Sequence, residues 1–257
     1  MIPLPHRLSE LQQKLFVLDT PLQRVTSFVE VITACPSTEA ADLFSQICVR
    51  PAVTRAALDL LVADAAFLAL IGDLWPEEHF RYTREAAAYT DDEVTLDFLV
   101  RPVRIDEQDG TFQVPRYTSD RVLTLGERKA LASMPSRQTL EKAMMDPHPD
   151  VAKKLLDNPK LTEADVVRIS AKSTMAPAVL CEIAAHPRWR RQKIVQKALV
   201  NNRLLPADFA LTLVPFLERR TLREVAGDAR LDERVRHGAA GVLHRMDEFL
   251  NQENRGL

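Results

Sequence analysis

DPHPDVAKKLLDNPKLTEADVVRIS, residues 146–170, is the part of the sequence that most clearly predicts a helical fold. It holds two short runs of helix-forming residues, and Asp146-Pro147 and Asn158-Pro159 bound the first of them. A short polar side chain bonds local backbone groups where a helix ends, and a proline blocks its continuation and starts the next one. Thr162, three residues before Asp165, is a capping signature for the second run. The stretch therefore predicts two helices joined by a tight turn.

The phrase that ends the first run, LLDNPKL, recurs along the C-terminal half of the chain. Two small or aliphatic residues precede Asp, Asn or His, and a large apolar residue that can pack back onto the helix usually follows. The copies begin at residues 143, 155, 183, 198 and 225, which gives a two-step period of about 42 residues, as in stacked multi-helix repeats. The predicted structural positions are Asp146, Pro147, Asn158, Pro159, His186, Pro187, Trp189, Asn201 and Asp228.

These phrases resemble the helix boundaries of the leucine-rich-repeat-variant and armadillo/HEAT-like class of bacterial α-solenoids. The resemblance covers about residues 127–240, and it implies a solenoid that binds a partner. It carries over no catalytic residue to this chain. The period of about 42 is closer to armadillo repeats than to the variant family, and the later copies NNRL and DARL lack the proline. The cysteine cluster that holds an iron–sulfur centre in some variant proteins has no counterpart here.

The rest of the chain divides into a helical region and a connector. Residues 1–88 read as amphipathic helices, and AVTRAALDLLVADAAFLALIGDLW, apolar over more than half its circumference, predicts a central buried helix. Residues 89–126 form an irregular connector: Thr90 with Glu93 favours a capped helix, the alternation from Val94 to Val100 favours a strand, and Asp109-Gly110 favours a hairpin. We therefore expect an all-α fold with an armadillo/HEAT-like array over residues 127–257.

Composition limits the classes of function. Apolar residues make up 46% and charged residues 27% of the chain, as in a globular protein, and the scarcity of glycine, 7 residues, argues against a phosphate-binding loop. The net charge of −2 gives the chain as a whole no electrostatic preference for nucleic acid, although residues 1–126 are acidic and residues 188–257 are basic. Cys35, Cys48 and Cys181 are expected to be buried, with no disulfide framework and no metal site. We expect no cofactor, and a cytoplasmic location.

The segment IAAHPRWRRQK, residues 183–193, offers the strongest candidate contact. Arg188, Arg190, Arg191 and Lys193 suit an acidic partner or phosphates, with Trp189 available for stacking on a base. The repeat gives His186 and Trp189 structural positions instead and leaves the four cations unexplained. Solvation of an exposed face is the alternative role for these cations.

Two other segments are rich in charged residues. The arginines of residues 217–245 alternate with acids at helical spacing, which is typical of an exposed face with internal pairs. In WPEEHFRYTRE, Glu77, Glu78 and His79 are sequence neighbours that point in different directions on a helix, which disfavours acid/base chemistry. The sequence predicts a non-catalytic protein-interaction module. A nucleic-acid-binding solenoid and an enzyme with a scattered site are the alternatives.

Overall fold

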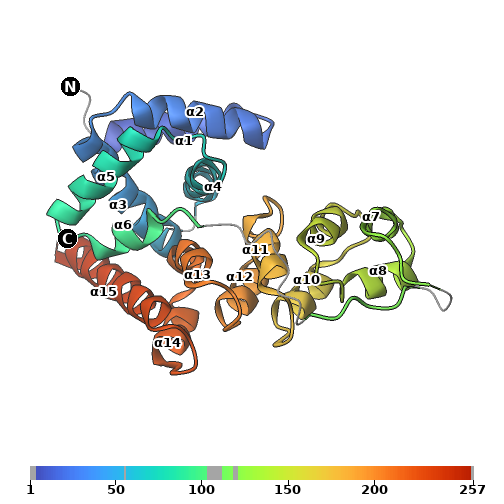
Figure 1. Cartoon of the computed structure of the whole chain (residues 1–257). Helices are drawn as coiled ribbons and strands as arrows, with labels where there is room; N and C mark the ends of the chain where they lie inside the picture. Colours follow the sequence, from blue (N-terminus) through green and yellow to red (C-terminus); the bar gives the residue numbers. More distant parts are fainter. Residues whose placement is uncertain (1–3, 55, 103–111, 118–120, 256–257) are drawn as a thin grey trace. The chain divides into compact units, whose positions relative to one another are not determined.

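The computed structural model describes residues 4–54, 56–102, 112–117 and 121–255. Their regular secondary structure is helical throughout, which confirms the all-α prediction for this part of the chain (Figure 1). The proposed turn at Asp109-Gly110 lies outside the described residues. No helix in the described ranges has both the length and the apolarity that crossing a bilayer requires.

The helices form two compact units, and the chain passes through the first one twice. Unit 1 consists of Met1–Pro102 and Leu211–Leu257, and unit 2 consists of Val103–Ala210. The division differs from the sequence-based one of 1–88, 89–126 and 127–257, because Leu211–Leu257 packs with the N-terminal residues. The fifth copy of the phrase, with Asp228, therefore belongs to unit 1.

Unit 1 is built around α4 and α3. Its elements are α1 (Leu4–Val17), α2 (Pro21–Thr33), α3 (Ser37–Val53), α4 (Ala57–Ile71), α5 (Glu77–Tyr89), α6 (Glu93–Phe98), η1 (Val214–Phe216), α14 (Arg219–Gly227) and α15 (Glu233–Arg255). α4 packs against α1, α2 and α3, and residues on all sides of it are buried, as its composition predicts. Trp75 stacks on Phe44 with ring centroids 4.9 Å apart, and further rings extend this aromatic core.

The C-terminal helix α15 completes the same core. It packs on α14, α3, α6 and η1. A Cβ at Gly241 would lie 3.2 Å from Val94 Cγ2, and one at Gly238 would lie 3.1 Å from Asp97 Oδ2, so these glycines let α15 approach α6 closely. Within the segment predicted as a connector, α6 is a helix rather than a strand. Its N-cap is Asp92, which accepts from Thr95 N at 3.1 Å, and not Thr90.

Unit 2 is a double row of short helices. Its elements are α7 (Leu125–Ser133), α8 (Arg137–Ala143), α9 (Pro149–Leu156), α10 (Glu163–Ser170), α11 (Pro177–Ala185) and α12 (Lys193–Val200), and α13 (Ala207–Leu213) lies at the border with unit 1. α7 packs on α9 and α9 on α11, while α10 packs on α12, so helices two positions apart in the chain stack on each other (Figure 1). The two helices predicted from residues 146–170 are α9 and α10, and the Thr162–Asp165 capping box is confirmed.

Candidate functional site

The recurring phrase forms a turn in which one polar side chain clamps the backbone two residues further on. In each copy the side chain accepts a hydrogen bond from the N–H of residue i+2, a donor of the turn that follows the helix. The acceptors are Asp146 and Asn158 at 3.0 Å, His186 at 3.3 Å, and Asn202 and Asp228 at 3.0 Å. The clamp is the physical basis of the sequence repeat.

In the fourth copy the clamp is Asn202, which corrects the assignment of Asn201 by one residue. Asn202 is 7% exposed, and the large apolar residue three positions on is Leu205 rather than Leu204. Asn201 is exposed, and its amide donates to Lys197 O within α12. The two adjacent asparagines offer the same side chain, so only the direction of each residue on the helix end separates them.

Two asparagines of the repeat also connect stacked helices. Asn158 Nδ2 donates to Ala132 O at 2.8 Å and to Met134 O at 3.0 Å, at the end of α7. Asn202 Nδ2 donates to Ser170 O at 2.7 Å and to Lys172 O at 3.1 Å, at the end of α10. The same latch therefore recurs after 44 residues and satisfies the otherwise unpaired carbonyls of an earlier helix.

The first copy replaces the amide latch with a buried ion pair. Arg128 Nη1 lies 2.7 Å from both carboxylate oxygens of Asp146, and Tyr117 Oη donates to Asp146 Oδ2 at 2.8 Å. Burial, and next the Asp146 charge, raise the pKa of Tyr117 and keep its hydroxyl protonated. An aspartate has no N–H to donate, so a cation and a hydroxyl complete this copy. Nothing in the local sequence identifies Arg128 or Tyr117 as these partners.

The third copy uses Trp189 as its latch. Trp189 is 1% exposed, and its Nε1 donates to Leu156 O at 2.8 Å, at the end of α9. His186 Nε2 lies 3.2 Å from Asp157 Oδ1, and burial lowers the pKa of His186 despite this neighbour. The indole is covered on one side by the Arg188 guanidinium, 4.1 Å from the ring. Trp189 therefore has no free face on which a base stacks.

The cations of this turn divide between surface and core. Arg188, Arg191 and Lys193 are exposed, whereas Arg190 is 1% exposed and its backbone carbonyl accepts from Gln196 Nε2 at 2.7 Å. The surface that the four predicted contact residues present thus consists of three of them. We call Arg188, Arg191 and Lys193 the basic turn.

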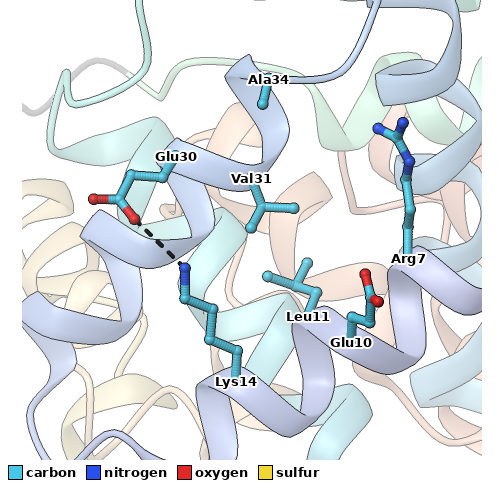
Figure 2. Close-up of a pocket in the computed structure, with 7 residues that line it drawn as sticks. All are labelled: Arg7, Glu10, Leu11, Lys14, Glu30, Val31 and Ala34. Carbon is cyan, nitrogen blue, oxygen red and sulfur yellow. Dashed lines mark ion pairs between the residues drawn. The ribbon is translucent and has the colours of Figure 1, made fainter. Parts of the chain in front are cut away.

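A hollow lies in unit 1 between α1 and α2 (Figure 2). It has a volume of about 500 Å³, and Leu11, Val31 and Ala34 form its apolar part. Its rim is charged: Lys14 Nζ pairs with Glu30 Oε2 at 3.5 Å, and Arg7, Glu10 and Lys14 follow one face of α1. No prediction from the sequence covers this hollow, although the spacing of these three charges places them on one face of the helix.

The charged groups of the hollow serve structural contacts. Arg7 Nη1 donates to Cys35 Sγ at 2.8 Å and lies 3.2 Å from Glu39 Oε2, and the first of these contacts raises the pKa of Arg7. Cys35 Sγ in turn donates to Val31 O at 3.2 Å. The guanidinium thereby links α1 to the end of α2 and the start of α3. The arrangement stabilises helix packing and brings no nucleophile next to a base.

His79, the weighed acid/base candidate, belongs to the aromatic core. Its Nδ1 accepts from Trp75 Nε1 at 3.0 Å, and its Nε2 donates to Cys35 O at 2.9 Å. Both nitrogens are occupied, so the ring orients Trp75 and ties the start of α5 to the end of α2. Glu77 pairs with Arg101 at 2.5 Å.

All three cysteines are buried, as predicted, and none of them forms a disulfide. Within the described ranges, no three His, Cys, Asp or Glu side chains gather as a metal ion requires. No protein-family model, curated protein or solved structure matches the chain.

Proposed function

We propose that this protein is a non-catalytic interaction module, a scaffold or adaptor, in which unit 2 is an armadillo/HEAT-like helical repeat. The observation that carries the proposal is the recurrence of the asparagine latch, from Asn158 to Asn202, between helices that stack two positions apart. Stacked repeats of this kind share a continuous core and leave an extended face for a partner. The function is therefore binding along the surface of the repeat.

The proposed contact is the basic turn of Arg188, Arg191 and Lys193, and the partner is a protein with an acidic segment. Arg188 is exposed and forms no ion pair in the described part of the chain, since its guanidinium lies over the Trp189 ring. That ring restricts the guanidinium without neutralising it, so less side-chain entropy is lost when a carboxylate binds. Arg190 is left out of the contact because its side chain is buried.

The test compares two charge reversals in the full-length protein. R188E/R191E reverses the basic turn, and R220E/R223E makes the same change in charge on exposed arginines of α14 in unit 1. Partners captured from native lysate by the wild type are purified and titrated against both variants. We expect R188E/R191E to weaken binding at least tenfold and R220E/R223E to leave it unchanged. Equal binding by both variants would remove the basic turn as the contact.

Binding to nucleic acid is the competing outcome. The burial of Trp189 under Arg188 takes away the stacking platform that single-strand binders use, which is why we favour a protein partner. Retention on single-stranded DNA and RNA columns at low salt measures this directly. We expect no retention. Retention that falls steeply with salt, and that R188E/R191E abolishes, would favour nucleic acid instead.

A further inference from the structure

The copy of the turn that carries the basic turn is also the copy whose clamp is a histidine. Asp146, Asn158, Asn202 and Asp228 hold this position in the other copies and accept the same i+2 N–H. An amide gains no proton near neutral pH, and Arg230 holds the pKa of Asp228 at about 2. Histidine is the side chain whose ordinary pKa, about 6.5, lies in the physiological range.

The geometry fixes which protonation state of His186 the turn accepts. Nδ1 accepts from Arg188 N at 3.3 Å, so the ring proton of the neutral form sits on Nε2 and points at Asp157 Oδ1. Both nitrogens are thus satisfied in the neutral ring. The charged groups that face it are Asp157, from the segment after α9, and Arg188, from its own turn.

Protonation of Nδ1 removes the clamp. The new N–H would point at the Arg188 N–H, so two donors would face each other, and the imidazolium would repel the adjacent guanidinium. The imidazolium attracts Asp157 more strongly than the neutral ring does. This attraction offsets the donor clash and the repulsion from Arg188 only in part, because the Asp157 side chain is 75% exposed and is screened by water. Burial disfavours the charged ring further and lowers its pKa.

We propose that His186 is a proton-sensitive clamp of the basic turn. The neutral ring holds Arg188 over Trp189, and the protonated ring releases it. The physiological meaning of this proton-sensitive clamp rests on the proposed function, because it regulates the same contact surface. Acidification would then weaken partner binding, because Arg188 of the contact surface would lose its fixed position. Asparagine, which the repeat uses elsewhere, would hold the turn at every pH.

The test follows the turn itself in the full-length protein. The Arg188 backbone amide and the Trp189 indole N–H are observed by ¹⁵N NMR between pH 8 and pH 5. In the wild type we expect both signals to shift together with one midpoint below the ordinary histidine value of about 6.5. In H186N both signals should stay constant, since asparagine keeps the acceptor and does not titrate. H148N, which changes the other histidine that caps a helix in unit 2, should leave the wild-type titration intact.

Two outcomes would overturn the proposed role of His186. One is a wild-type Arg188 amide that does not change over this range, and the other is an equal change in H186N. Neither readout involves a partner. The proposed role of His186 can therefore fail while the proposed interaction stands, and the proposed interaction can fail while the role of His186 stands. Once the purified partner is in hand, its affinity should fall between pH 7.5 and pH 5.5 for the wild type and not for H186N.

Discussion

The side chain of Asn202 satisfies three backbone groups, whereas its neighbour Asn201 satisfies one. Asn202 accepts from Leu204 N and donates to Ser170 O and Lys172 O, and its side chain is buried. Asn201 donates to a carbonyl of its own helix from an exposed position. Adjacent and chemically identical residues therefore differ in what their loss would leave unpaired.

We predict that N202A lowers the free energy of unfolding by about 2–4 kcal/mol, because buried carbonyls and an N–H lose their partners. N201A should change it by less than about 0.5 kcal/mol, as exposed substitutions commonly do. Urea denaturation followed by circular dichroism measures both. Equal effects of the two substitutions would contradict the assignment of the latch to Asn202.

At this scale the sequence identifies the kind of residue more reliably than its number. The phrase locates the clamps Asp146, Asn158, His186 and Asp228, because a proline follows the first three and no other polar side chain adjoins Asp228. Asn201 and Asn202 compete for one role, and the sequence contains nothing that separates them. The burial of Arg190 was equally invisible, since the neighbouring arginines are exposed and only tertiary packing distinguishes them.

Among elements, the start of α10 is fixed by a carboxylate that serves two helices. Asp165 completes the capping box with Thr162, and it accepts a bidentate pair from Arg137 of α8, with both N–O distances 2.7 Å. The Asp165 side chain is 5% exposed, and the Arg137 hydrogen bonds are the largest cause that lowers its pKa. The ion pair joins two helices that belong to the same row of unit 2.

We predict that D165N destabilises the protein by about 1–3 kcal/mol at pH 7, a range reduced because Arg137 is half exposed. A carboxylate whose folded-state pKa is depressed stabilises above the unfolded value of about 3.9 and loses this contribution as pH falls. The gap between wild type and D165N should therefore be largest above pH 5 and narrow below pH 4. Unfolding free energies measured at several pH values give this gap.

The control for D165N is E141Q, because Glu141 is the other carboxylate that pairs with Arg137 and lies in solvent. E141Q should alter stability by less than about 0.5 kcal/mol. A gap between wild type and D165N that stays constant from pH 7 to pH 3 would show that the Asp165 charge contributes nothing.

Helices with strong local signals were predictable, and those without were not. α9 and α10 have proline or threonine at their start and an apolar stripe, so local and tertiary preferences agree. In α6 the residues from Val94 to Phe98 suit a strand or a helix, and the Asp92 cap with burial against α3 and α15 decides for the helix. The helices that pack on α6 and favour its helical form, α3 and α15, lie far from it in the sequence.

At the scale of the molecule, unit 1 needs both ends of the chain. Arg245 of α15 bonds to Asp92 and to Ser45, 153 and 200 residues earlier. The sequence predicts one region over residues 127–257, because the phrase with Asp228 continues past unit 2. Contacts between segments so far apart leave no periodic signal, which is why the division into units could not be predicted.

We predict that a fragment of residues 1–102 does not fold alone, because α3 and α6 lose the apolar surface that η1 and α15 cover. Adding a fragment of residues 211–257 should restore helical circular dichroism and a single species in gel filtration. A cooperative thermal transition in residues 1–102 by themselves would contradict this expectation. A scrambled peptide of the 211–257 composition serves as the control.

The passage of the chain twice through unit 1 also sets an order of events on the ribosome. All of Val103–Ala210 leaves the exit tunnel before Leu211–Leu257 does, so unit 2 is complete outside the ribosome while unit 1 still lacks α14 and α15. Domains fold as units during synthesis, and an incomplete one exposes apolar surface. The N-terminal helices of unit 1 therefore stay partly assembled, and accessible to chaperones, until α14 and α15 emerge.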